Sequence, residues 1–383
     1  MKSEMFFPKE TKNAQEDIEK TQASIIISLA PPIEYTEQKN IILYRGIKKE
    51  EYDEIYEFLR DQNEMSSGNF TLFPKDEIAR YMRFNSLVVL MRSSKSNALL
   101  GTIFSMIFPI NCLNSFQENT ITETTQENTQ GEIIFHGCTT FLNVHKKLRK
   151  HGLCMALIRD LTNYAYENKI YCSYSLTSFP LSPKSFEITA WYRPLNLARS
   201  VGLGFTYPNW NVPSEFLKNR VLYNTKMPKK YTCERVTNSK LELSHSFYRK
   251  QIKDKNFAFM PEITFFNKWI QEYPTFLVSE NKIPVGLFSI GSVYCRMMSG
   301  LDGRLALSLL FVSLPEQSSK VMKSMIYTAN EREYDALYMH EVGDIRQEIL
   351  KEINAIETPG KSYFSLYNNS MTLTPSDLYI PLF

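Results

Sequence analysis

Two similar successions of apolar and polar segments follow one another along the chain. Each has a strand, two helices, two antiparallel strands, a strand that leads into a helix, and a last strand. The first succession is predicted over residues 44–47, 48–60, 73–82, 86–91, 99–107, 139–166 and 171–177. The second is predicted over residues 233–236, 237–250, 260–270, 275–279, 285–290, 306–329 and 336–339.

Agreement in order over this many successive elements indicates an internal duplication. Antiparallel strands followed by a parallel strand-helix-strand unit predict an α/β protein (α+β mixed sheet). The plan resembles that of the N-acetyltransferases, so we expect two tandem N-acetyltransferase-like (GNAT) halves with pseudo-two-fold symmetry. The predicted divisions are an N-terminal arm over residues 1–40, a first half over 41–228 and a second half over 229–383.

The composition is that of a globular protein. Of the 383 residues, 43% are hydrophobic and 22% are charged, and the net charge of +3 disfavours nucleic acid as the main partner. The six cysteines are scattered without a CxxC pair, so neither a disulfide framework nor a metal site is expected. No uninterrupted apolar run reaches the ~20 residues that span a bilayer. We therefore expect a cytoplasmic protein without a transmembrane segment.

The strongest functional signal is FLNVHKKLRKHGLC over residues 141–154, where an apolar strand leads into an amphipathic helix. The first N–H groups of a helix have no intrahelical partner, and the helix dipole favours an anion there. Gly152 allows close backbone approach, and Arg149, Lys150 and His151 add charge. The stretch therefore predicts a diphosphate site. A solvated basic helix start or a small nucleic-acid patch would present the same short basic run.

The second half lacks such a loop. At the matching place it has LPEQSS over residues 314–319, with an acid, a proline and no basic residue. We therefore expect the first half to hold a phosphate-bearing cofactor and the second half to be free for another task. The polar run over residues 114–131 predicts a flexible surface excursion.

Four short segments resemble motifs of the glycylpeptide N-tetradecanoyltransferases, also called N-myristoyltransferases. FLNVHKKLR over residues 141–149 is similar to the family's FLCVHKKLR, which leads into the diphosphate loop for myristoyl-CoA. PPIE over residues 31–34 is similar to GPIE, and WYRPLN over 191–196 to WHRSLN. SLYN over residues 365–368 is similar to part of YLYNW. The likeness is strong at 141–149 and faint elsewhere.

The resemblance implies transfer of a myristoyl group from myristoyl-CoA to the N-terminal glycine amine of proteins or peptides, without a metal. The backbone N–H groups of Phe141 and Leu142 would form an oxyanion hole, and the C-terminal carboxylate of Phe383 would be the general base. The acyl-CoA would contact Phe6, Phe7, Leu142, Asn143, Val144, Arg149, Lys150, His151, Gly152, Leu153 and Cys154. The substrate peptide, held with help of the second half, would contact Thr140, Ser175 and Tyr192.

Departures from the family pattern fall mainly on the peptide side. FTLFP over residues 70–74 replaces the family's FRFDY, and ETPG over residues 357–360 replaces its GDG loop. Thr140 and Ser175 replace an asparagine and a threonine, and Gly152 replaces a basic residue. We therefore expect a monomeric N-myristoyltransferase with altered peptide preference. Two alternatives stay open: an N-acyltransferase that uses a shorter acyl-CoA, and a non-catalytic protein that binds acyl-CoA or acylated peptides.

Overall fold

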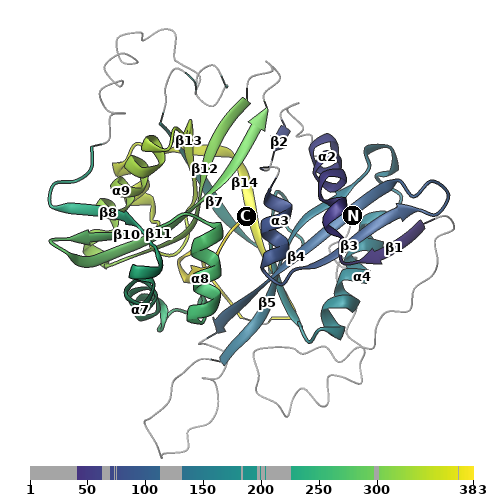
Figure 1. The fold of residues 1–383 in the computed structure, drawn as a ribbon, viewed down its shortest axis with the longest axis horizontal. Coiled ribbons are helices and arrows are strands. Elements are labelled where there is room, and N and C mark those ends of the chain that lie inside the picture. Colours follow the sequence, from purple (N-terminus) through teal and green to yellow (C-terminus); the bar gives the residue numbers. More distant parts are fainter. Residues whose placement is uncertain are drawn as a thin grey trace, which may run out of the picture.

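The computed structural model describes residues 41–62, 70–72, 74, 76–112, 132–182, 184–195, 199, 203, 226–296, 302–369 and 371–383. The predicted arm over residues 1–40, which includes Phe6 and Phe7, and the predicted excursion over residues 114–131 lie outside these residues. Two lobes lie side by side along one continuous mixed sheet (Figure 1).

The first lobe contains the elements of the first predicted succession in the predicted order. Its strands are β1 (Ile41–Arg45), β3 (Leu87–Ser93), β4 (Leu99–Cys112), β5 (Glu132–Val144) and β6 (Cys172–Thr177). Its helices are α2 (Tyr52–Gln62), α3 (Glu77–Arg83) and α4 (Leu153–Glu167). Strand β5 begins earlier than the predicted start at residue 139, because its first half pairs with the long strand β4.

The second lobe repeats this order. Its strands are β8 (Tyr231–Arg235), β10 (Thr275–Glu280), β11 (Ile283–Arg296), β12 (Asp302–Ser313) and β13 (Ala336–His340). Its helices are α7 (Leu241–Ile252), α8 (Ile263–Glu272), α9 (Ser318–Glu331) and the short α10 (Gln347–Glu352). Short strands β2 (Phe70–Leu72), β9 (Phe257–Phe259) and β15 (Leu378–Tyr379) add to the sheet.

The two lobes exchange a strand. The sheet order is β1-β3-β4-β5-β6-β14-β7-β13-β12-β11-β10-β8. Strand β7 (Phe186–Pro194), from the first half of the chain, pairs with β13 of the second lobe, while β14 (Ile356–Tyr367) pairs with β6 of the first. Counted from either end of the sheet, the strands of one lobe come in the same order and the sixth strand belongs to the other half of the chain, β14 in one case and β7 in the other. This is the arrangement that the predicted pseudo-two-fold symmetry requires. The sequence patterns predict neither β7 nor β14, and the boundary between the halves after residue 228 stays a prediction.

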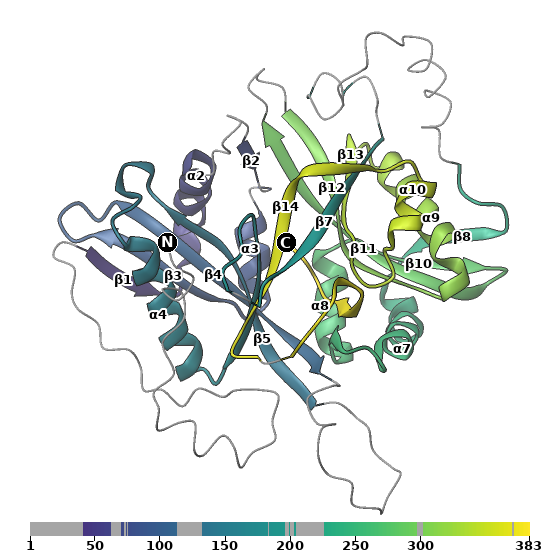
Figure 2. The same ribbon diagram turned by 180° about the vertical axis from the view of Figure 1, so that it is seen from behind.

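Strand β3 illustrates why the sheet is buried on both faces. Leu87, Val89 and Met91 pack against α4, whereas Val88 and Leu90 pack into the core beneath α2 and α3. Successive side chains of a strand point to opposite faces, so a run of consecutive apolar residues serves two helical layers. Figures 1 and 2 show these helices on the two sides of the sheet.

Glu77, at the start of α3, is a buried carboxyl group where the lobes meet. The Tyr273 hydroxyl donates to its Oε1 at 3.1 Å, and Nη1 of Arg80 donates to its Oε2 at 3.0 Å. Burial opposes ionisation more than Arg80 and Tyr273 favour it, and raises the pKa of Glu77 to about 7. The charge of Glu77 therefore changes near neutral pH.

The Glu77→Gln variant is expected to lose part of the pH dependence of stability. Between the ordinary pKa of 4.5 and the folded-state value of about 7, the folded protein binds more protons at this site than the unfolded chain. The free energy of unfolding of the native protein should therefore fall as the pH rises through this window, by roughly 2–3 kcal/mol from this group. Urea unfolding of both proteins from pH 4.5 to pH 8 measures the difference, and parallel profiles would contradict this assignment.

Candidate active site

Strands β5 and β6 run parallel and then separate. Residues 136–138 pair with residues 172–174. Beyond these, β6 continues only with β14, while β5 stays paired with β4 as far as Val144. We call the region between the diverging segments, residues 139–144 of β5 and 175–177 of β6, the first wedge.

A β-bulge interrupts β5 in the first wedge. Phe141 and Leu142 together oppose the single residue Ile103 of β4. Phe141 has a φ of +51°, and the buried Thr102 hydroxyl donates to its carbonyl oxygen at 2.9 Å. A positive φ is unfavourable for a residue with a Cβ, so the surrounding contacts must hold the backbone in this conformation.

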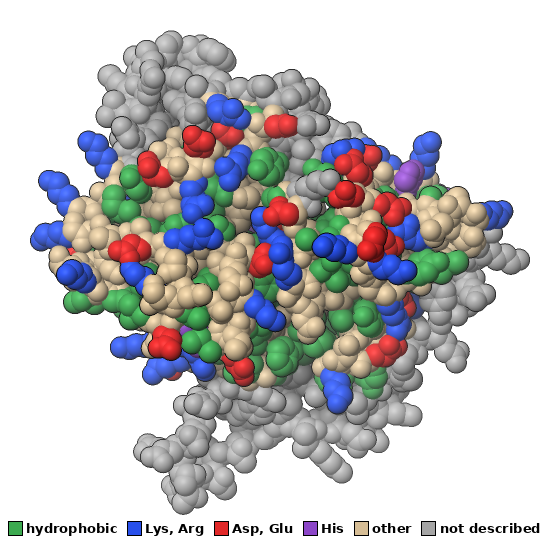
Figure 3. All heavy atoms as spheres, in the orientation of Figure 1, with side chains coloured by type: hydrophobic (Ala, Val, Ile, Leu, Met, Phe, Trp, Pro, Cys, Tyr) green, Lys and Arg blue, Asp and Glu red, His purple; other side chains and the backbone are tan. Residues whose placement is uncertain are grey.

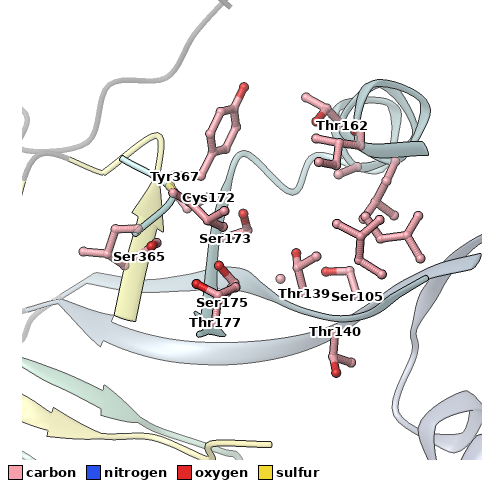
Figure 4. A pocket seen from close by; sticks show the side chains of 18 of the residues that line it. Ser105, Thr139, Thr140, Thr162, Cys172, Ser173, Ser175, Thr177, Ser365 and Tyr367 are labelled. Carbon is pink, nitrogen blue, oxygen red and sulfur yellow. Dashed lines mark hydrogen bonds between the residues drawn. The ribbon is translucent and has the colours of Figure 1, made fainter. Parts of the chain in front are cut away.

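A cavity of about 520 Å³ lies between the first wedge and α4 (Figure 4). Strands β4, β5, β6 and β14 contribute one wall, and α4 contributes the other with Ile158, Leu161 and Ala165. Leu142 is 37% exposed and reaches this cavity from the bulge. A mostly apolar cavity of this size, with a few polar groups, suits a small-molecule ligand.

The loop between β5 and α4 is tied to the end of α2. Nε of Arg149 donates to the Val144 carbonyl at 3.2 Å, and its Nη2 donates to the Gln62 carbonyl at 2.7 Å. The Gln62 side chain also accepts from the Lys146 N–H at 2.8 Å. Arg149 therefore fixes the shape of the loop with two of its donors, besides any charge that it offers to a ligand.

Gly152 begins α4 with a φ of +77°, which favours glycine. An added Cβ there would meet no atom within 4 Å, so the helix start is accessible. No residue in the described ranges accepts a hydrogen bond from the N–H groups of Gly152, Leu153 or Cys154. Lys150 and His151 are exposed beside them. Unpaired N–H groups at a helix start, with cations nearby, suit an anionic ligand.

Away from this helix start, positive and negative side chains are mixed on the surface. Lys, Arg, Asp and Glu side chains are interspersed over the described part of the face in Figure 3. Within the described ranges, no group of His, Cys, Asp and Glu side chains could hold a metal ion. The helices of those ranges include none long and apolar enough to cross a membrane.

The thiols near the cavity are poor nucleophiles. Cys154 and Cys172 line it, and burial raises the pKa of Cys154 and raises that of Cys172 to about 12. Cys138 of β5 is also buried, and burial raises its pKa to about 12. Because the thiolate is the reactive form, these residues favour a reaction without a covalent cysteine intermediate.

The last residue, Phe383, lies at the centre of the molecule between the two lobes (Figures 1 and 2). Its ring contacts Tyr81 of α3 and Trp269 of α8, with centroid distances of 5.6 and 6.3 Å. Tyr81 also contacts Phe141, at 4.8 Å. The chain's last residue and the bulge of β5 therefore share a neighbour.

The Tyr81 hydroxyl is buried at this junction and has no hydrogen-bond partner in the described part of the chain. Burial raises the pKa of Tyr81 well above its ordinary value, and the nearby carboxyl group of Glu77 raises it further. The Tyr174 hydroxyl of β6 donates to the Pro381 carbonyl at 3.2 Å and so anchors the end of the chain to the first lobe.

No protein-family model matches the sequence, and a search of curated proteins found no match. The solved structures include clear neighbours. N-myristoyltransferase of Saccharomyces cerevisiae with bound myristoyl-CoA matches with a TM-score of 0.74 and 12% sequence identity, over 97% of this chain and 87% of that chain. The chain has the N-myristoyltransferase fold.

Two further structures are similar to the chain. The yeast enzyme with bound myristoyl-CoA and inhibitors gives a TM-score of 0.73 and 13% identity, over 91% of this chain and 86% of that chain. A GCN5-related glucosamine N-acetyltransferase region of a fungal multi-domain β-N-acetylglucosaminidase gives 0.52 and 10%, over 88% of this chain and 39% of that chain. The predicted fold class and the predicted resemblance are thereby confirmed at the level of the fold.

In this N-myristoyltransferase fold, the second lobe has a matching region between β12 and β13, which we call the second wedge. Unlike the first wedge, it is filled by other residues of the chain. Residues 305–307 pair in parallel with residues 336–338, and Leu309 forms a bulge opposite β11. Beside the bulge, residues 378–382 pack so closely that a space of only about 20 Å³ is left. Asp344 joins the parts, because it accepts from the Ser313 N–H at 3.0 Å and from the Tyr379 hydroxyl at 2.7 Å.

The structure brings many of the sequence-predicted site residues together. Thr140, Phe141, Leu142, Cys154 and Ser175 line the cavity. Asn143 and Val144 continue β5 from the bulge, and Arg149, Lys150, His151, Gly152 and Leu153 form the loop and the start of α4. Tyr192 does not line the cavity but lies in β7, opposite Tyr338 and Ile356. The roles of all these residues stay predictions.

Sequence reasoning did not single out Tyr81, Ser105 or Ser173. Tyr81 connects the bulge with Phe383, and the two serines line the cavity. A signal for the serines does exist, since each is a small hydroxyl residue within an apolar strand that faces a helix. The sequence pattern alone does not show whether a cavity lies between such a serine and the helix that covers the strand.

Proposed function

We propose that the protein is an N-acyltransferase that transfers a myristoyl group from myristoyl-CoA to the N-terminal glycine of proteins or peptides. The observation that carries the proposal is the combination, in one lobe, of a bulged strand, an open cavity beside it and an accessible helix start. The yeast structures of the same fold contain bound myristoyl-CoA, which supports the same class of donor here. The closed wedge of the second lobe supports a single donor site.

In this proposal the acyl-CoA lies along β5 and ends at α4. The N–H groups of Gly152, Leu153 and Cys154 hold the diphosphate, Lys150 adds positive charge, and the exposed His151 lies beside them. The pantetheine arm runs beside residues 142–144, and the acyl chain enters the cavity under α4.

The reaction is a direct attack of the glycine amine on the thioester carbonyl. The N–H groups of Phe141 and Leu142 stabilise the negative charge that develops on the carbonyl oxygen. The α-carboxylate of Phe383 takes the proton that the ammonium must lose before attack. As the tetrahedral intermediate collapses, the C–S bond breaks and the departing CoA thiolate takes the second proton from the nitrogen, which leaves the amide and CoA. An α-amino group has a pKa near ~8, so a well-placed weak base suffices.

The peptide would approach from the side of the sheet opposite α4. Thr140 points to that side in Figure 4, toward the layer that contains Tyr81 and Phe383. We assign Thr140 to the peptide's first residue and Tyr192 to a later one, because Tyr192 lies farther along the sheet in β7. Ser175, which the resemblance also assigns to the peptide, lines the cavity on the α4 side and would lie beside the acyl chain. The second lobe would provide the rest of the groove, and the protein would act as a cytoplasmic monomer.

Incubation with labelled myristoyl-CoA and peptides that begin with glycine tests the proposal. The expected product is an N-myristoylated peptide, formed with glycine but not with an acetylated N-terminus. Faster transfer from shorter acyl-CoA esters would favour the alternative that the protein is an N-acyltransferase that uses a shorter acyl donor. Tight binding of acyl-CoA without any transfer would favour the non-catalytic alternative.

The Gly152→Ala variant is expected to bind acyl-CoA about tenfold more weakly. An Ala at a φ of +77° costs roughly 1–2 kcal/mol, and relief of this strain would turn the N–H groups at the start of α4 away from the ligand. Calorimetric titration measures the loss. Gly46→Ala is the matched control, since Gly46 has a φ of +79° with open space around it but lies after β1. Equal losses of affinity in both variants would contradict the assigned loop.

A further inference from the structure

Four hydroxyl groups on the cavity wall opposite α4 have no hydrogen-bond partner among the described residues. Ser105, Thr139, Ser173 and Ser175 lie around the same space in Figure 4. The side-chain hydroxyl of none of these residues forms a hydrogen bond with another residue in the ranges that the structure describes. We call these four residues the hydroxyl floor.

Other hydroxyl groups around the cavity differ from the hydroxyl floor. Ser365 is hydrogen-bonded to Ser185 at 2.7 Å, Thr162 donates to the Ile158 carbonyl at 2.8 Å, and Thr177 donates to the Phe179 carbonyl at 2.6 Å. Unlike these three, the hydroxyls of the floor have no partner in the described ranges, and they lie together on one wall of the cavity.

Gly137 keeps the Ser105 hydroxyl uncovered. A Cβ at Gly137 would come within 2.3 Å of Ser105 Oγ, so any side chain there would displace it or cover it. Gly137 pairs with Ser173 across β5 and β6, and Ser105 pairs with Thr139 across β4 and β5. The floor is thus continuous over three neighbouring strands.

The hydroxyl floor lies where the acyl chain of the proposed donor must run. The loop at α4 marks the diphosphate end of the site, and the bulge at Phe141 marks the carbonyl. Thr139 lies two residues before Phe141, away from the loop, or about 7 Å along the strand at ~3.3 Å per residue. The first carbons of the acyl chain would therefore pass over these hydroxyls.

The opposite wall has different chemistry. Ile158, Leu161 and Ala165 of α4 present apolar side chains to the same space, beside Thr162, whose hydroxyl is already bonded within the helix, and the polar Asn163 and Tyr166. An acyl chain without a hydroxyl would match that wall. It would, however, separate the floor hydroxyls from water and offer them no partner, which is unfavourable. A chain that is apolar on one side and carries an oxygen on the other would match both walls.

We propose that the preferred acyl donor is a long-chain hydroxyacyl-CoA, with its hydroxyl on the first few carbons after the carbonyl. This inference rests on the proposed function, because it takes the cavity as the acyl site. A hydroxyl both donates and accepts, as do the Ser and Thr side chains of the floor, so each can satisfy the other.

Calorimetric titration of the full chain with three esters tests the inference: myristoyl-CoA, β-hydroxymyristoyl-CoA and δ-hydroxymyristoyl-CoA. At least one hydroxylated ester should bind five- to tenfold more tightly than myristoyl-CoA, about the effect of one additional hydrogen bond. The Ser105→Ala/Ser173→Ala double variant should bind myristoyl-CoA more tightly than the native protein and lose the preference. The two single variants serve if the double variant does not fold.

Ser308→Ala is the matched control. Ser308 lies on β12 in the second lobe, and its buried hydroxyl likewise has no partner in the described ranges, but it is not part of this cavity. It should keep the native preference. Equal affinity of the native protein for all three esters, or a preference that survives loss of both serines, would overturn the inference and leave the proposed function standing. Failure of all three esters to bind would overturn the proposed function itself.

Discussion

Conversion of the α-carboxylate of Phe383 to a carboxamide is expected to lower kcat by about 10²–10⁴-fold, the usual contribution of a general base. The carboxamide has nearly the same size, so the ring of Phe383 should keep its contacts with Tyr81 and Trp269. The amide cannot take the proton from the ammonium group. Affinity for acyl-CoA should stay nearly unchanged, because the proposed site holds the donor at the loop before α4 and in the cavity, away from the carboxylate.

Single-turnover kinetics and calorimetry on proteins released from an intein fusion measure these two effects. Cleavage with ammonia gives the carboxamide, and hydrolysis of the same fusion gives the free acid as the matched control. Extension of the chain beyond Phe383 should act in the same direction as the carboxamide. Normal turnover by the carboxamide form would rule out the terminal carboxylate as the base.

The Leu142→Pro variant is expected to lose about 10²–10³-fold in kcat, the typical effect of removing one oxyanion-hole donor. Proline removes the backbone N–H at this position. Because proline also disfavours the conformation of the preceding Phe141, whose φ is +51°, the fold and acyl-CoA affinity of the variant are measured beside its activity. The buried Thr102 hydroxyl should still hold the Phe141 carbonyl from below. Pre-steady-state transfer to a glycine peptide measures the loss.

Leu142→Ala separates the backbone from the side chain, because it keeps the N–H and removes most of the side-chain contact with the cavity. It should lose less than about tenfold in kcat. Acyl-CoA binding and thermal unfolding establish that the Pro variant is folded. Equal losses in the Pro and Ala variants would assign the effect to the side chain and contradict the oxyanion role.

Local patterns in the sequence specify most of the elements. The apolar run over residues 86–91 predicts a strand, and the structure places a strand there with a helical layer on each face. The basic stretch that ends at Gly152 predicts a helix start, and the positive φ of Gly152 agrees with the choice of glycine. Strands and helix starts of this kind depend on residues that are adjacent in the sequence, so they can be predicted without knowledge of the tertiary structure.

Pairing between distant segments could not be predicted in the same way. Strands β7 and β14 gain their hydrogen-bond partners from the opposite lobe, and their segments carry no pattern that names those partners. Thr102 and Phe141 are far apart in the chain, although one holds the bulge at the other. The unpaired state of the Tyr81 hydroxyl likewise depends on what packs around it.

The sequence alone determined the duplicated α/β plan, the loop before α4 and the resemblance to N-myristoyltransferases. Each of these features depends on short stretches of residues that are close in the chain. Tertiary structure decided which wedge is open, how Phe383 reaches the neighbourhood of Phe141, and which hydroxyls face the cavity. Those features depend on the space left when segments from both halves pack together. The end of the chain closes the second wedge, whereas the cavity beside the first stays open.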